Sequence, residues 1–172
     1  EELVVALDEA GLDMAVALGM GWTGLEVAQE ANDYILESTA KYPKRIIPFC
    51  SVSPAWGEPA LREAERCARL GARGIGELHP DTQGFSLADA GVMAPIMELA
   101  RSLNLIVLTH ASEPVGHLYP GKGAVTPDIL MGLIQQHQDV PIVCAHWGGG
   151  LPFYALMPEV RQALANAYFD TA

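Results

Sequence analysis

The sequence predicts an α/β fold, a (β/α)8 TIM barrel of which about six βα units are present. Six short apolar runs typical of strands are separated by amphipathic segments of helical length, which predicts a parallel sheet with crossover helices. Polar side chains follow at least three of these runs, where the active sites of such barrels lie. A complete barrel typically needs about 250 residues, and the chain has 172. We therefore expect residues 1–172 to form a single, partial barrel domain.

An open, doubly wound sheet would also contain parallel strands in series, and chain length alone does not separate the two folds. The segment Gly19–Gly24 has neither the G-x-G-x-x-G spacing nor the lysine of a nucleotide-binding loop. Polar residues at several strand ends also suit a barrel site better. The expected strands are 14–18, 45–52, 73–79, 103–110, 140–146 and 167–171.

The helices between these strands have their own start signals. Residues Thr23–Glu26 fit a capping box, and Pro59 and Pro127 suit the first turn of later helices. Pro95 precedes a run of apolar residues with helical spacing, so we expect it to open a helix. We expect the last helix to begin near Leu151, with an apolar stripe at Phe153, Leu156, Val160 and Leu164.

Composition excludes several classes of function. There are 21 acidic and 10 basic residues, and the resulting net charge of −11 repels nucleic acid and anionic membrane surfaces. The apolar stretches are shorter than the ~20 residues that span a bilayer. The cysteines Cys50, Cys67 and Cys144 are far apart and lie in apolar patterns, so we expect buried free thiols in a reducing compartment. The chain is expected to be cytoplasmic.

Two strands each finish on an imidazole, His110 after residues 106–109 and His146 after residues 142–145. A strand end is a rigid mount for a metal ligand, and metals bind neutral imidazole. Either histidine could instead be satisfied by backbone hydrogen bonds. Three glycines follow Trp147, which indicates a close backbone approach or a tight turn into a helix.

A third strand carries Glu77 and His79, two residues apart and therefore on one face. A carboxylate inside a barrel is costly unless it is paired or binds a cation. Glu77 could ligate or bridge a metal, or it could accept a hydrogen bond from a neighbouring barrel side chain. His79 is expected to help shape the pocket.

The segment after His110 is a long polar loop, and loops of this length are uncommon without a function. We expect Glu113 and His117 to line a substrate pocket together with Trp147, although plain exposure of the loop and ordinary packing of Trp147 are the alternatives. There is no G-x-S-x-G elbow, and no cysteine lies in a loop suited to nucleophilic catalysis. Metal chemistry is the best-supported class.

In these features the chain resembles the amidohydrolase superfamily, in the branch of metal-dependent TIM-barrel hydrolases that includes aminocarboxymuconate-semialdehyde decarboxylase. The resemblance rests on residues 6–13, 74–80, 108–110, 144–149 and 168–171.

This resemblance implies a divalent metal, with zinc expected. His110 matches the strand-five histidine that binds metal. His146 matches the strand-six histidine, which is implied to act in acid-base catalysis or to hold a second metal. Glu77 falls at strand four, where some relatives place a bridging ligand. The chain lacks the His-x-His of strand one, and Asp170 matches strand seven instead of the metal-binding aspartate of strand eight. It therefore looks like a fragment without strands one and eight, and by itself is expected to be nearly inactive.

For the intact protein these observations predict a metal-dependent hydrolase that cleaves a C–N or C–O bond of a small molecule with a metal-activated water. His146 would be the catalytic residue, and His110, His146 and Glu77 the metal ligands. One alternative is a nonoxidative decarboxylase, a lyase of the same family. The other is a non-catalytic, barrel-derived binding module. Unpaired sheet edges make a homo-oligomer possible.

Overall fold

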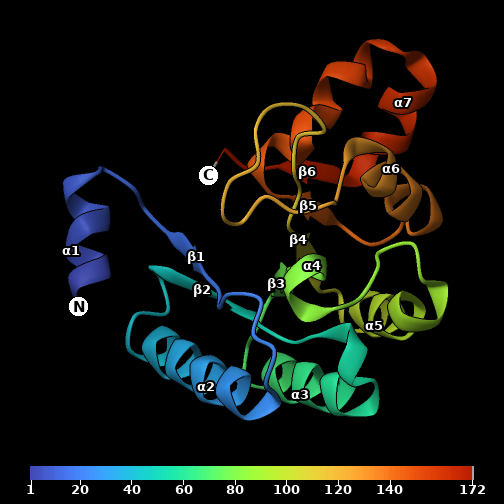
Figure 1. The fold of residues 1–172 in the computed structure, drawn as a ribbon. Coiled ribbons are helices and arrows are strands. Elements are labelled where there is room, and N and C mark those ends of the chain that lie inside the picture. Colours follow the sequence, from blue (N-terminus) through green and yellow to red (C-terminus); the bar gives the residue numbers. More distant parts are fainter. Residues whose placement is uncertain (172) are drawn as a thin grey trace.

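Six parallel strands form the centre of the computed structural model, which describes residues 1–171. Each strand pairs with its neighbours in sequence, in the order β1-β2-β3-β4-β5-β6. The sheet is curled, and helices lie along its outer side (Figure 1). The strands are β1 (Ala15–Ala17), β2 (Ile46–Cys50), β3 (Gly74–Leu78), β4 (Ile106–Thr109), β5 (Ile142–Cys144) and β6 (Ala167–Phe169). The prediction of an incomplete (β/α)8 barrel with six successive strands is confirmed.

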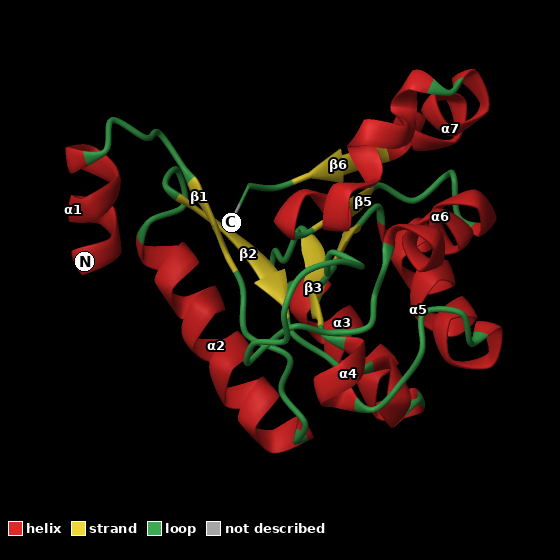
Figure 2. Cartoon of the chain, turned by 45° about the horizontal axis from the view of Figure 1, so that its top comes forward, coloured by secondary structure: helices red, strands yellow, loops and turns green. Residues whose placement is uncertain are grey.

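Helices occupy the expected connections between strands (Figure 2). Prolines stand in the first turn of α3 and α6, as predicted. The α-helices are α1 (Glu2–Glu9), α2 (Leu25–Lys41), α3 (Glu58–Arg69), α4 (Pro80–Gln83), α5 (Ala90–Leu103), α6 (Pro127–Gln136) and α7 (Pro158–Ala163). Three 3-10 segments are η1 (Pro54–Trp56), η2 (His146–Leu156) and η3 (Leu164–Asn166).

Two predicted helix starts are wrong. Gly24, with an extended backbone, is the residue before α2, and no side chain caps this helix. Thr23 therefore lies one residue too early for the predicted capping box. Helix α5 begins at Ala90 because the carboxylate of Asp89 accepts hydrogen bonds from the first-turn amides. Pro95 lies inside α5 instead of opening it, at the cost of one backbone hydrogen bond.

The helix predicted from Leu151 is also wrong. The chain from His146 to Gly150 runs through five successive residues with positive φ, which no right-handed helix contains. Only 158–163 are α-helical in this region. Phe153 and Leu156 are 80% and 90% exposed, so they do not share a buried stripe with Val160 and Leu164.

The core has two parts on opposite faces of the sheet. Most buried residues pack between the strands and the outer helices, among them Val107 of β4. The adjacent Leu108 packs with Phe49 and Ala145 in a smaller cluster on the other, inner face. This alternation follows from the two-residue period of a strand. It leaves the ends of the strands as the place where polar side chains can gather.

A buried polar cluster joins α2 and α3 to β2. The carboxylate of Glu63, only 2% exposed, accepts hydrogen bonds from Asn32 Nδ2 at 2.8 Å and from Arg66 Nε and Nη2, both at 2.8 Å. Burial alone would raise the pKa of Glu63, but these hydrogen bonds outweigh it and lower the pKa below 4.5. The cysteines Cys50, Cys67 and Cys144 are buried free thiols, as predicted.

Within residues 1–171, no helix has the length and apolar character needed to cross a membrane.

Candidate metal centre

Three of the predicted site residues converge at the carboxyl ends of adjacent strands. Glu77 lies near the end of β3, His110 directly follows β4, and His146 lies two residues after the end of β5. Oε1 of Glu77 is 2.9 Å from Nδ1 of His110 and 4.0 Å from Nε2 of His146. One donor atom from each of the three side chains lies within 4.8 Å of the other two. The strand order alone brings these groups to one edge, because parallel strands end on the same side.

The backbone around Glu77 depends on a glycine. Gly76 has a φ of 149°, and a Cβ atom there would lie 2.5 Å from the carbonyl oxygen of Leu108 on β4. Glycine therefore allows β3 and β4 to approach closely just before Glu77. The register between these strands shifts between Ile75 and Leu78, which marks the same irregularity.

The turn that carries His146 is strained and held from two sides. His146 has a φ of 53°, a conformation that costs a non-glycine residue on the order of 1–3 kcal/mol. The carboxylate of Asp170 accepts a hydrogen bond from the His146 amide at 2.8 Å, and its carbonyl accepts one from Trp147 at 2.9 Å. A Cβ on Gly149 would lie 2.3 Å from the carbonyl oxygen of Ser112. The glycines thus serve both predicted purposes, a sharp turn and a close approach.

The second of the two predicted strand-end residues on β3 also joins the cluster. The ring of His79 stacks on that of His110 with centroids 4.1 Å apart, and the ring of His146 meets His110 edge-on at 4.9 Å. Burial, followed by the nearby charge of His110, lowers the pKa of His79 below 6.5. Burial opposes ionisation of Glu77, but the His110 hydrogen bond and the surrounding imidazoles lower its pKa below 4.5. The site therefore holds a carboxylate at neutral pH.

This set of donors fits a divalent cation. One carboxylate and two imidazoles are ligands that Zn²⁺ accepts, and imidazole and carboxylate ligands also suit other divalent transition metals. The Glu77 side chain is 23% exposed, so its negative charge is partly withdrawn from water. A nearby positive charge would therefore stabilise the carboxylate. The hydroxyl of Ser112 lies 3.3 Å from Nε2 of His110 and orients the ring from the other side. Sequence reasoning missed Ser112.

A cavity of about 370 Å³ opens over these side chains. Its walls combine the predicted residues with three from the β4–α6 loop that were not predicted, Tyr119, Pro120 and Gly121. Their only sequence signal is the length of this loop. The lining residues are Glu77, His79, His110, Tyr119, Pro120, Gly121 and His146.

The structure does not bring the other three predicted pocket residues into this wall. Glu113 forms an ion pair with Lys122 at 3.2 Å, and its side chain is 40% exposed. His117 is exposed on the same loop and packs against Tyr119. Trp147 is 53% exposed. Substrate contact by these three residues therefore stays a prediction.

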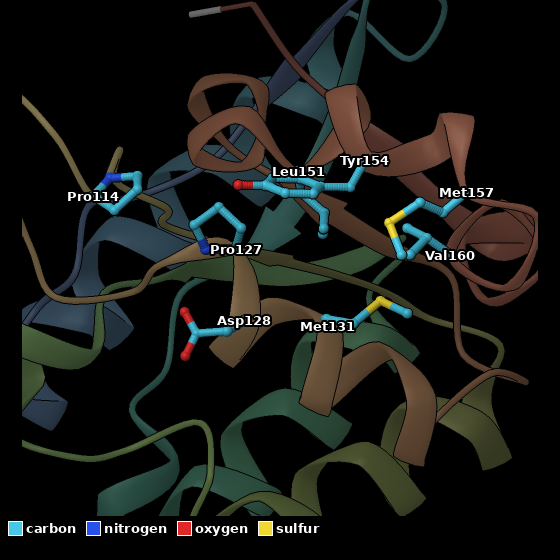
Figure 3. A pocket seen from close by; sticks show the side chains of 8 residues that line it. All are labelled: Pro114, Pro127, Asp128, Met131, Leu151, Tyr154, Met157 and Val160. Carbon is cyan, nitrogen blue, oxygen red and sulfur yellow. The ribbon is translucent and has the colours of Figure 1, made fainter.

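A separate, mostly apolar pocket of about 450 Å³ lies between α6, η2 and α7 (Figure 3). Asp128 is the only acidic group among its lining residues, and none of them is a histidine or cysteine. It offers no group set for acid-base or metal chemistry, so the strand-end cavity is the candidate active site. The lining residues are Pro114, Pro127, Asp128, Met131, Leu151, Tyr154, Met157 and Val160.

Comparison with known proteins shows the family of the chain. Residues 6–172 match the amidohydrolase family. The chain belongs to this family. It is 28% identical to gamma-resorcylate decarboxylase of Polaromonas sp. over 165 residues, which cover 80% of the chain and 49% of that relative. The chain thus spans about half the length of this curated relative.

Solved structures show the same fold. The chain superposes on 5-carboxyvanillate decarboxylase from Sphingomonas paucimobilis with a TM-score of 0.76 at 19% identity, covering 99% of the chain and 64% of that structure. For 5-carboxyvanillate decarboxylase from Novosphingobium aromaticivorans, which was solved with bound manganese, the TM-score is 0.73 at 27% identity. This match covers 95% of the chain and 54% of that structure.

These relatives favour one of the expected chemistries over another. Two of them, at 28% and 27% identity, carry the names of decarboxylases, which agrees better with the decarboxylase alternative than with the hydrolase that the sequence predicts first. A divalent metal is supported by the family and by the manganese-bound neighbour, whereas zinc has no direct support.

Proposed function

We propose that the intact protein is a metal-dependent, nonoxidative decarboxylase of a small aromatic acid. The observation that carries this proposal is the convergence of Glu77, His110 and His146 within one cavity, in an amidohydrolase chain whose relatives carry the names of decarboxylases. His110 and Glu77 would hold the metal, together with ligands from the rest of the barrel. A bound divalent metal would anchor the substrate carboxylate and offset negative charge.

The protein's own side chains then have defined tasks. Decarboxylation replaces the bond from a ring carbon to its carboxylate by a bond to hydrogen, so carbon dioxide leaves and one proton is consumed. His146 is the imidazole best placed to deliver that proton, because its side chain is 42% exposed, lines the cavity and faces Glu77 at 4.0 Å. His110 is only 9% exposed, and Glu77 fixes its ring through Nδ1. It therefore suits a ligand that would bind the metal through Nε2, in place of the Ser112 hydroxyl that lies 3.3 Å from this atom.

The coarser features of the protein follow the same proposal. We take residues 1–172 as one part of a single barrel domain, acting on a small molecule and not on nucleic acid, since the net charge is −11. Buried free thiols suit a cytoplasmic protein. We expect the protein to form a homo-oligomer. We expect the metal to be zinc, as the sequence analysis does, or manganese.

The test is a product analysis with the full-length protein, loaded with Mn²⁺ or Zn²⁺. We expect 2,6-dihydroxybenzoate or 5-carboxyvanillate to release carbon dioxide together with the corresponding phenol in equal amounts. His146→Asn should lower turnover at least 100-fold while the metal content stays unchanged. His110→Ala should lower the metal content itself. Hydrolysis of an amide or ester without release of carbon dioxide would contradict the proposal and restore the hydrolase.

A further inference from the structure

We propose that Tyr119 forms the wall of the cavity that binds the ring of an aromatic acid, and that Lys122 positions it. This inference rests on the proposed decarboxylation and extends it to the recognition of the ring. The observation behind it is that the strand-end imidazoles and the segment Tyr119–Gly121 line the same cavity.

The cavity has two chemically different sides. The strand ends contribute Glu77, His79, His110 and His146, all polar and titratable. The β4–α6 loop contributes a tyrosine, a proline and a glycine. An aromatic acid has the same two-part character, with a charged end and an apolar face. A volume of about 370 Å³ is at the lower end of the ~300–1,000 Å³ of small-molecule sites and suits one ring.

Tyr119 is held in place before any ligand binds. Its hydroxyl donates a hydrogen bond to Oε2 of Glu113 at 3.0 Å, and its carbonyl accepts one from the amide of Lys122 at 3.1 Å. The ammonium of Lys122 lies over the ring, 5.8 Å from its centroid. A ring fixed in this way loses little entropy when a ligand stacks on it.

Lys122 is the residue around which the loop folds. Its side chain is only 9% exposed, although lysine is seldom buried without partners. It forms an ion pair with Glu113 at 3.2 Å and donates hydrogen bonds to the carbonyls of Val115 and His117 at 2.7 and 3.4 Å. These contacts span the loop from residue 113 to residue 122. Loss of the ammonium would therefore release Tyr119 together with the loop.

The experiment compares two unreactive probes on the full-length, metal-loaded protein by calorimetry. Benzoate and cyclohexanecarboxylate carry the same charge on rings of similar size, and only benzoate can stack. We expect the wild-type protein to bind benzoate more tightly. Tyr119→Leu should weaken benzoate binding by about two- to tenfold, the usual size of an aromatic pair, and leave cyclohexanecarboxylate within about twofold. Tyr119→Phe should keep the preference for benzoate.

Lys122→Met should reduce the preference for benzoate in the same direction, and Lys122→Arg should restore part of it. Leu118→Ala is the matched control, since Leu118 is 89% exposed on the same loop and is not a lining residue of the cavity. Equal binding of the two probes by the wild-type protein would overturn the inference. So would an unchanged preference in Tyr119→Leu.

Failure of this inference is distinguishable from failure of the proposed function. A Tyr119-dependent preference for benzoate without any release of carbon dioxide from aromatic acids would contradict the decarboxylase and keep the ring-binding wall. Release of carbon dioxide without a Tyr119-dependent preference for benzoate would keep the decarboxylase and contradict the ring-binding wall.

Discussion

Replacing Glu63 by alanine should destabilise the protein far more than replacing an exposed glutamate of the same helix. The Glu63 carboxylate is 2% exposed and accepts hydrogen bonds from Asn32 and Arg66. The variant would leave the Nδ2 group of Asn32, itself 1% exposed, with fewer acceptors. It would also remove one half of an ion pair.

The magnitude follows from how far each partner can reach water. Breaking a fully buried ion pair costs about 3–5 kcal/mol, and a buried donor that loses its acceptor costs about 1–3 kcal/mol. The Arg66 side chain is 38% exposed and also contacts Asp33 at 2.8 Å, so it keeps one partner and some hydration. After this discount we expect Glu63→Ala to lower the free energy of unfolding by about 2–4 kcal/mol.

The assay is urea denaturation of the full-length protein, followed by circular dichroism, with Glu65→Ala as the control. Glu65 is 43% exposed and pairs with Arg69 on the same helix, so its loss should cost at most about 0.5 kcal/mol. Because the folded pKa of Glu63 is lowered, its contribution is present above pH 4.5 and is lost as the pH falls through the lower folded value. The difference between wild type and Glu63→Ala should shrink accordingly. Equal effects of the two variants would refute the reasoning.

Three further predictions concern other parts of the chain. Gly149→Ala should lower activity at least tenfold and should also lower stability, because a Cβ would lie 2.3 Å from the Ser112 carbonyl oxygen. The control is Gly132→Ala in α6, where a Cβ has open space, so that this variant should be neutral or stabilising by up to about 1 kcal/mol. Turnover and thermal melting are measured for both variants. The three cysteine thiols should resist a thiol reagent in the native protein and react with it in urea. All three are buried, and burial raises the pKa of Cys144 to about 12. Rapid labelling of the native protein would contradict this prediction. Burial lowers the pKa of His137 below 6.5, so the folded state binds fewer protons than the unfolded state. The stability of the wild-type protein should therefore fall as the pH drops below 6.5. Urea denaturation at several pH values should show a less steep fall for His137→Gln than for the wild type.

The strands and the core of the site were predictable from the sequence because both depend on short-range patterns. Each strand is a short apolar run, and parallel strands necessarily end at one edge of the sheet. Hence the sequence predicts that Glu77, His110 and His146 lie at the same edge of the sheet. The reaction could not be predicted in the same way, because hydrolases and decarboxylases both place their polar residues at strand ends of this kind. We propose decarboxylation because of the names that two relatives carry, and not because of the spacing of the site residues in the sequence.

The segment after β5 shows where local patterns fail. Its apolar spacing predicts a helix from Leu151, but five residues with positive φ and the contact between Gly149 and Ser112 produce an irregular turn instead. Helix α5 likewise begins where Asp89 caps it and then accommodates Pro95 in its interior. In each case a cap or a tertiary contact outweighed the periodicity.

The sequence by itself determined the series of parallel strands, the free thiols and the polar groups at the strand ends, because these follow from side-chain character at fixed spacing. Only the tertiary structure decided which loop residues face the site. Tyr119 lines the cavity, whereas Glu113 and His117 on the same loop do not. The physical reason is that Lys122 pairs with Glu113 and with carbonyls several residues away, and such long-range contacts leave no periodic trace in the sequence.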